Sequence, residues 1–182
     1  MNKAFKTLIF ILIAAFIFKG AMYRMCVKYK AIGERQPIAI TNQTLKEIVD
    51  SEVLKETISH KNIAGLASQV TMKILHFSSN SASQNPNDLI NTKQANCVGY
   101  SALFNSVANY LIIKHQLQKE IVATHKYGEL FFFGVNLHSY LNGPFFKSHD
   151  YNEIKNLKTE EVILIDPSLR DHTGVKFIVE RY

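Results

Sequence analysis

The chain contains little cysteine: only Cys26 and Cys97 occur among its 182 residues. Two distant cysteines cannot form the disulfide framework that is typical of small secreted domains, so cysteine usage does not identify the cellular compartment. No second cysteine or closely spaced pair of histidines accompanies Cys97, which argues against a zinc site that combines it with His138 or His149. We therefore expect no metal ion and no other cofactor.

Acidic residues are missing from the first thirty positions, which carry six of the 21 basic residues. The other 15 basic residues equal the 15 acidic ones in number, so the formal net charge of +6 comes from the N-terminal end. Nucleic-acid binding needs a basic stripe on the folded body, whereas a basic end beside an apolar run is typical of a membrane-surface signal. We therefore expect no nucleic-acid partner.

The main apolar run, residues 8–18 (LIFILIAAFIF), is short for a membrane span. As a helix it covers about 16 Å, roughly half of a hydrocarbon core of about 30 Å. Flanking residues and snorkelling by Lys6 and Lys19 are needed to complete a span. Small residues do not occupy the alternate positions that signal-peptide cleavage requires after Gly20 or Ala21. We predict a signal anchor over residues 1–25, with a cleaved signal peptide and a buried core helix as alternatives.

An anchor of this kind predicts a membrane-attached protein with its folded part outside the cytoplasm, or a secreted protein if the segment is cleaved. The charge distribution disagrees with that orientation, because more positive charge follows the apolar run than precedes it. Orientation and oligomeric state therefore stay open. We expect residues 26–40 to be a linker and residues 41–182 to form one domain.

The pattern after residue 41 predicts an α+β domain. Helical spacing of apolar residues predicts helices in 41–59, 62–77 and 97–114, the first with a capping box formed by Thr44 and Glu47. Short segments rich in β-branched and aromatic residues predict strands at 129–137, 149–154, 161–166 and 175–182. Helices that precede strands indicate an antiparallel sheet that is covered on one face by the helices.

A polar loop gives way to an apolar, helix-patterned run within KQANCVGYSALF, residues 93–104. Free cysteine is among the most buried residue types, so Cys97 alone fits a small buried side chain. In the first turn of a helix, however, the free N–H groups and the positive end of the dipole stabilise a thiolate. Gly99 leaves one side of that turn without a side chain, where we expect a substrate backbone to approach. Cys97 is thus a candidate nucleophile, which needs a base and a group that orients the base.

His149 is the strongest candidate base among the seven histidines. It opens the segment HDYNEI, where strand alternation puts Tyr151 on the same face. Asp166 ends the next predicted strand, EVILID, and a short antiparallel connection sets its carboxylate beside the imidazole, where it fixes the tautomer. We interpret His125 as a surface residue, and His138, at the end of a strand, stays an alternative base.

Three segments in this order, NCVGYSALFNSVANYL, HDYNEI and VILIDPSL, resemble the transglutaminase-like superfamily of papain-like cysteine enzymes. The pattern of that family has a cysteine at the start of a long helix, then a histidine with an aromatic residue two positions later, and Asp-Pro-Ser or Asp-Pro-Thr at the end of the next strand. The resemblance covers residues 93–169. It implies that the nucleophile-bearing helix packs on an antiparallel sheet.

Carried over to this sequence, the resemblance implies that Cys97 is the nucleophile, His149 the base and then the acid, and Asp166 the orienting group. This triad implies acyl transfer from an amide bond through a thioester, with a protein or peptide as the substrate. A developing oxyanion needs donors, and the backbone N–H of Cys97 supplies one of them. The second is the side chain of Gln94 or Asn96, although Asn96 also suits an N-cap.

The expected substrate-lining residues are Gly99 and Tyr151. Hydrolysis of peptide bonds is the first interpretation, because the domain is small and carries no extra modules. Deamidation and glutamine–amine crosslinking share the triad and differ in the group that attacks the thioester. The alternative is a membrane-tethered, non-catalytic domain of the same fold that binds a peptide or cell wall. The presence of all three triad residues argues against it.

Overall fold

The computed structural model of the chain describes residues 3–53, 59–79, 83–141 and 148–181. These residues form an α+β fold, as predicted, with seven α-helices and an antiparallel sheet in the part described. The elements in chain order are α1 (Lys3–Ile17), α2 (Lys19–Cys26), β1 (Val27–Arg35), α3 (Gln43–Val53), α4 (His60–Ile74), β2 (His76–Phe77), α5 (Pro86–Thr92), β3 (Gln94–Ala95), α6 (Cys97–Lys114), β4 (Ile121–Phe132), β5 (Val135–Asn136), the 3₁₀ turn η1 (Leu137–Ser139), β6 (His149–Asn156), β7 (Val162–Ile165), α8 (Pro167–Thr173) and β8 (Val179–Arg181).

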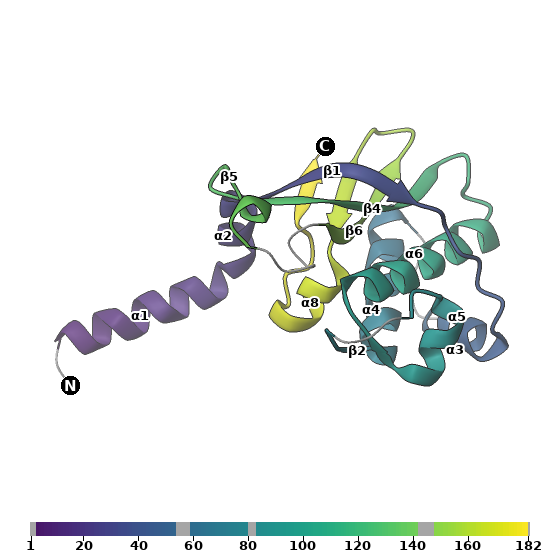
Figure 1. Cartoon of the computed structure of the whole chain (residues 1–182), viewed down its shortest axis with the longest axis horizontal. Helices are drawn as coiled ribbons and strands as arrows, with labels where there is room; N and C mark the ends of the chain where they lie inside the picture. The colour runs from purple at the N-terminus through teal and green to yellow at the C-terminus, as the bar shows by residue number, and fades with distance from the viewer. Residues whose placement is uncertain (1–2, 54–58, 80–82, 142–147, 182) are drawn as a thin grey trace.

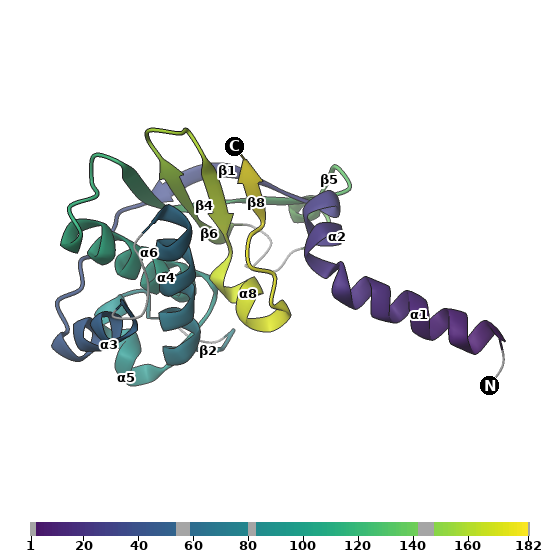
Figure 2. The same cartoon turned by 180° about the vertical axis from the view of Figure 1, so that it is seen from behind.

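The main sheet has the strand order β1-β4-β6-β7-β8, and β5 pairs with β4. All of these pairs are antiparallel, so β6, β7 and β8 form the predicted meander. Helices α3 to α6 and α8 lie on one side of this sheet (Figures 1 and 2). The order of helices before strands is not strict, because β1 precedes the helices and the short parallel pair of β2 and β3 lies among them.

Strand β1 corrects the expectation of a linker over residues 26–40. Its residues pair with β4 over nearly the whole of its length, from Val27 opposite Phe132 to Arg35 opposite His125. The close contact depends on Gly128 of β4, where an added Cβ atom would lie 2.2 Å from the carbonyl oxygen of Lys30. Pairing with β4 therefore makes this basic segment an edge strand of the domain.

A register shift between Ala31 and Gly33 interrupts the β1–β4 ladder. A bulge of this kind inserts one residue and reverses the alternation of side chains beyond it. Tyr29, before the shift, lies opposite Leu130, whereas Arg35, after the shift, lies opposite His125. The two side chains consequently reach opposite faces of the sheet, although their separation of six residues would place them on one face of a regular strand.

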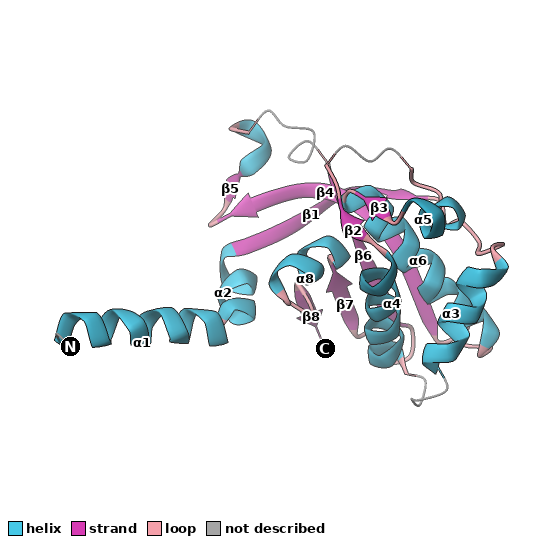
Figure 3. Cartoon of the chain, turned by 90° about the horizontal axis from the view of Figure 1, so that it is seen from below, coloured by secondary structure: helices cyan, strands magenta, loops and turns pink. Residues whose placement is uncertain are grey.

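Helix α6 packs against both helix α4 and the sheet (Figures 1 and 3). Thirteen of its 18 residues are buried, so apolar residues surround it on most sides. Its N-cap is Asn96, whose side chain accepts hydrogen bonds from the backbone N–H groups of Val98 and Gly99. This burial and this cap fix the position of Cys97, the first residue of the helix.

Helix α3 begins at Gln43, and its cap differs from the predicted capping box. The side chain of Asn42 accepts a hydrogen bond from the N–H of Leu45 at 3.1 Å. Thr44 therefore lies within the first turn and is not the N-cap. Asparagine is as good an N-cap as serine or threonine, and its earlier position starts the helix before Thr44.

Helices α1 and α2 divide the N-terminal apolar segment, and α1 extends away from the domain (Figures 1 and 2). Helix α1 has 15 residues, which correspond to about 22 Å of rise, less than a hydrocarbon core of about 30 Å. Among the described residues, no helix combines the length and the apolar character that a membrane crossing requires. The signal anchor over residues 1–25 and the membrane localisation stay predictions.

Candidate functional site

Cys97, His149 and Asp166 come together in the fold from three separate elements. Cys97 starts α6, His149 starts β6, and Asp166 directly follows β7 and caps α8. The pairing of Asn152 with Ile165 in the β6–β7 ladder places Asp166 beside the start of β6. All three side chains are buried, with exposed fractions of 5%, 1% and 3% respectively.

His149 and Asp166 form a close hydrogen-bonded pair, with 2.5 Å between Nε2 and Oδ2. Burial, the largest single influence, lowers the pKa of His149, but the charge and hydrogen bond of Asp166 and an interaction with Cys97 outweigh it. Together they raise the pKa of His149 to about 10. The imidazole is therefore protonated at neutral pH, which is the state that an adjacent carboxylate favours.

Cys97 interacts with the same imidazole, because its side chain contributes both a hydrogen bond and a charge interaction to the raised pKa of His149. The ring therefore interacts with both a sulfur and a carboxylate. A position at a helix N-terminus beside a positive imidazolium is typical of reactive cysteines.

The Asp166 carboxylate accepts hydrogen bonds from several further groups. Oδ2 accepts from the hydroxyl of Tyr29 at 3.0 Å, and Oδ1 accepts from the hydroxyl of Ser168 and the N–H of Leu169 at 2.7 and 2.9 Å. Burial, again the largest influence, raises the pKa of Asp166, but the charge and hydrogen bond of His149 and the hydrogen bonds from Leu169 and Ser168 outweigh it and hold the pKa below its usual value. Asp166 is therefore an ionised, fixed partner for the imidazole.

A second buried ion cluster lies next to the first, on the opposite face of β6. Asp150, which is fully buried, bonds with both of its oxygens to the guanidinium group of Arg35. Its Oδ1 is also 2.9 Å from Nε2 of His125. The expectation that His125 lies on the surface is wrong, because β4 carries it into the interior, where its side chain is only 3% exposed.

The second oxyanion donor, Gln94 or Asn96, stays a prediction. The side-chain oxygen of Asn96 caps α6, and the backbone of Gln94, in β3, pairs with that of His76. Gly99 does not leave an open side of the helix: an added Cβ atom there would lie 2.6 Å from the Cβ of Ala95. The expectation that a substrate backbone approaches Gly99 is therefore wrong, because neighbouring chain fills that space.

Tyr151 is buried beneath Tyr29, with the two rings at 68° and their centroids 5.0 Å apart. It supports the histidine side of the cluster, since Tyr29 also packs against His149 with ring centroids 5.9 Å apart. His138 accepts a hydrogen bond from the N–H of Leu130 through Nε2. In the described part of the chain no group of three or more histidine, cysteine or acidic residues is arranged to hold a metal ion.

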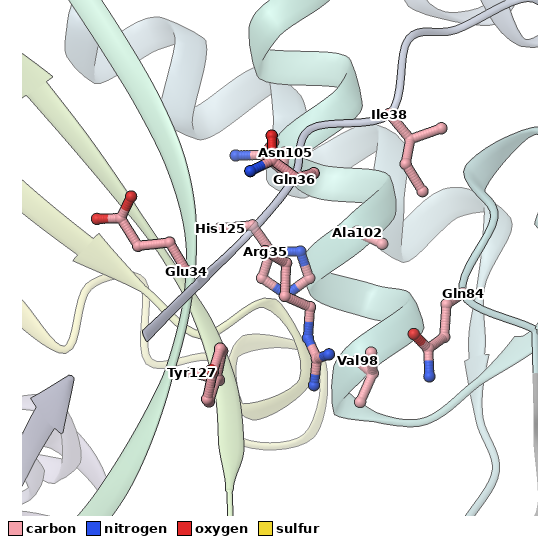
Figure 4. A pocket seen from close by; sticks show the side chains of 10 residues that line it. All are labelled: Glu34, Arg35, Gln36, Ile38, Gln84, Val98, Ala102, Asn105, His125 and Tyr127. Atoms are coloured by element: carbon pink, nitrogen blue, oxygen red, sulfur yellow. The ribbon is translucent and has the colours of Figure 1, made fainter. Parts of the chain in front are cut away.

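Two pockets of different chemistry flank the cluster. The first, of about 390 Å³, is mainly apolar, and its walls include His149, Asp166, Tyr29, Phe77 and Leu130. The second, of about 360 Å³, is more polar and lies between strands β1 and β4 and helix α6 (Figure 4). It is lined by Glu34, Arg35, Gln36, Ile38, Gln84, Val98, Ala102, Asn105, His125 and Tyr127.

Sequence reasoning missed Tyr29, Arg35 and Asp150. The signal for β1 was present, because Val27, Tyr29 and Ala31 alternate with lysines in the pattern of a half-buried strand. The pairing of Arg35 with Asp150 had no comparable signal, since it depends on the bulge in β1. No family model, curated protein or solved structure matches the chain.

Proposed function

We propose that this protein is a transglutaminase-like cysteine enzyme that hydrolyses amide bonds in peptides or proteins. The observation that carries the proposal is the position of the His149 ring, which interacts with both Cys97 and Asp166. A nucleophile, a base and a group that orients the base are the components that acyl transfer through a thioester requires.

In the proposed reaction the Cys97 thiolate attacks the carbonyl carbon of an amide and forms a tetrahedral intermediate. The carbon–nitrogen bond then breaks, and the His149 imidazolium gives its proton to the departing amine. Water next attacks the thioester and gives a proton to His149, and the carbon–sulfur bond breaks. The products are a carboxylic acid and an amine, and the thiolate–imidazolium pair is restored. Asp166 stays ionised and holds the ring throughout.

The developing oxyanion needs hydrogen-bond donors at the start of α6. The N–H groups of Val98 and Gly99 are used by the Asn96 cap. The N–H of Cys97, the first residue of the helix, is the donor that this geometry favours. We expect a substrate to reach this end of the helix through the polar pocket beside Val98.

A second candidate function is a non-catalytic domain of the same fold that binds a peptide. The burial of the cluster favours it, because exposed fractions of 5% for Cys97 and 1% for His149 leave little access for a substrate. The two functions predict different behaviour of the thiol, since catalysis requires that reagents reach Cys97, whereas a binding domain has no such requirement.

The test is alkylation of the full chain by iodoacetamide, with Cys26 as the internal reference. The two cysteines are the only ones in the chain, and mass spectrometry of their peptides follows each separately. We expect Cys97 to react faster than Cys26 at neutral pH, with a pH profile that changes in His149→Gln. Slow reaction of Cys97, equal in the native protein and in the variant, refutes an activated thiol.

A peptide library then identifies the chemistry, because hydrolysis, deamidation and crosslinking give different mass changes. The matched control is Cys97→Ala, which removes the sulfur but little volume from the end of a helix. Unchanged circular dichroism with complete loss of activity is expected. Product formation by Cys97→Ala at the native rate contradicts the proposal.

A further inference from the structure

The polar pocket beside α6 has the construction of a binding site. Val98, Ala102 and Asn105 face it from α6 at spacings of four and three residues, so they lie along one face of the helix. The pocket thus begins next to Cys97 and follows the helix for about 10 Å, which corresponds to about three residues of an extended peptide. Figure 4 shows Arg35 between Val98 and Tyr127, and Asn105 at the other end.

Arg35 is held firmly at the end of the pocket nearer to Cys97. Its Nε and Nη2 atoms donate to Asp150, and its guanidinium carbon lies 5.1 Å from the centre of the Tyr127 ring. The hydrogen bond of Asp150, the largest influence, raises the pKa of Arg35, and Cys97 is among the groups that add to this rise. The guanidinium group therefore lies near the start of α6, and it shares the pocket wall with Val98, the neighbour of Cys97.

The same group remains partly open to a ligand. The Arg35 side chain is 34% exposed although its partner Asp150 is fully buried. Asp150 engages two of the three guanidinium nitrogens, and Nη1 makes no hydrogen bond to the part of the chain that the structure describes. A fixed guanidinium with a free edge is suited to a carboxylate, because its position is already determined before the ligand arrives.

Asn105 provides an independent sign of a ligand at the far end. Its side chain is 2% exposed, and its Oδ1 accepts a hydrogen bond from Asn109, yet its Nδ2 has no hydrogen-bond partner among the described residues. A buried donor without a partner is costly and normally marks a missing acceptor. A carbonyl oxygen of an extended ligand would supply it.

We propose that this pocket binds an acidic segment of the substrate, with Arg35 recognising a carboxylate near the scissile amide and Asn105 a carbonyl farther along. The inference rests on the proposed function and specifies its substrate class. The other acid of the pocket does not oppose it, because Glu34 is largely exposed and faces Lys126, with 3.8 Å between the charged atoms. The alternative is that the pocket binds a neutral amide group in place of a carboxylate.

Two nearly isosteric reagents test the charge preference without knowledge of the natural substrate: iodoacetate carries a carboxylate, whereas iodoacetamide is neutral. The measured quantity is the ratio of their rate constants at Cys97 in the full chain. The perturbing variant is Arg35→Gln with Asp150→Asn, which removes both charges of the pair and leaves no buried carboxylate unpaired. We expect this ratio to fall by about tenfold or more.

The matched control is Lys158→Gln with Glu120→Gln. It removes an ion pair of 2.7 Å between two residues that do not line the pocket. We expect the native ratio in this control. A second perturbation, Gln84→Glu, adds a negative charge at an exposed position of the pocket wall and does not endanger the fold. Gln84→Glu should lower the ratio of the iodoacetate rate constant to the iodoacetamide rate constant. Gln118→Glu adds the same charge at an exposed position after α6 and should leave this ratio unchanged.

The outcomes separate this inference from the proposed function. A ratio that falls in the Arg35 and Gln84 variants but not in the control variants supports an acidic subsite, that is, a pocket that binds acidic groups. If Cys97 reacts rapidly with iodoacetamide but the ratio is the same in every variant, the acidic subsite is refuted while the activated thiol stands. If Cys97 of the native protein reacts with neither reagent, both proposals are refuted.

Discussion

The charge of Asp166 should control the protonation of His149, and Asp166→Asn tests this relation with little change in shape. Asparagine keeps an oxygen that accepts from Leu169 and Ser168, so the cap of α8 is retained. The substitution removes the negative charge that lies 2.5 Å from Nε2 of His149. What remains is burial, which lowers the pKa of the histidine, and the interaction with Cys97, which raises it.

The expected magnitude follows from the structure. The difference between an ordinary histidine pKa of 6.5 and a value of about 10 corresponds to a preference for the imidazolium on the order of 5 kcal/mol. A unit charge pair at 2.5 Å contributes roughly 7 kcal/mol at an effective dielectric constant of about 20, before the cost of burial. The charge interaction with the carboxylate is thus strong enough to account for most of the rise in the pKa of His149. We therefore expect this pKa to fall to about 7 or below in Asp166→Asn.

The assay is a pH titration of the His149 ring signals by NMR, assigned by comparison with His149→Gln. Asp171→Asn is the matched control: it removes a carboxylate from the same short helix, α8, where Asp171 bonds to Tyr100 rather than to the histidine. In that control we expect a pKa of about 10 for His149. A His149 pKa that stays near this value in Asp166→Asn would show that the carboxylate does not hold the imidazolium.

The remaining predictions concern stability and are checked by chemical denaturation. Because the folded-state pKa of His149 lies above 6.5, its stabilising contribution is complete below pH 6.5 and is lost as the pH rises through about 10. The difference in unfolding free energy between the native protein and His149→Gln should therefore shrink over that range, and a constant difference would contradict the raised pKa. Asn96→Ala removes the cap of α6 and should cost about 1 kcal/mol; no loss would mean that the cap is not formed in solution. Gly128→Ala forces a Cβ against the carbonyl of Lys30 and should lower the melting temperature strongly, whereas Gly65→Ala in α4, with open space around it, should be neutral or stabilising. Equal effects of the two glycine substitutions would refute the close β1–β4 contact.

Local patterns were sufficient for much of the fold. Apolar residues at helical spacing predicted α6 to its last residue, and the alternation and turn residues after residue 149 predicted the meander of β6 to β8. Boundaries that depend on a single side chain were less accurate: Asn42 caps α3 where the sequence suggested Thr44. Two acceptable caps lie within three positions, and only the path of the preceding chain decides between them.

The surroundings of the cluster could not be predicted in the same way. The sequence suggested that Asp166 lies beside His149, because one strand connection separates them, and the two are hydrogen-bonded. The burial of His125 depends on β4 starting at Ile121, eight residues before the predicted strand. The closed space at Gly99 depends on Ala95, whose position is set by the pairing of β2 with β3. Contacts of this kind come from tertiary packing and leave no periodic signal.

Strand β1 connects the candidate catalytic cluster to the polar pocket. Because of the bulge after Ala31, its Tyr29 bonds to Asp166 on one face of the sheet, while its Arg35 bonds to Asp150 on the other. His149 and Asp150 are consecutive residues of β6, so the two buried ion pairs share one backbone segment. An edge strand is held by a single ladder of hydrogen bonds. A displacement of β1 from β4 would therefore remove a donor from the triad carboxylate and the cation from the pocket in one step, which makes this edge the part of the fold on which both proposed activities depend.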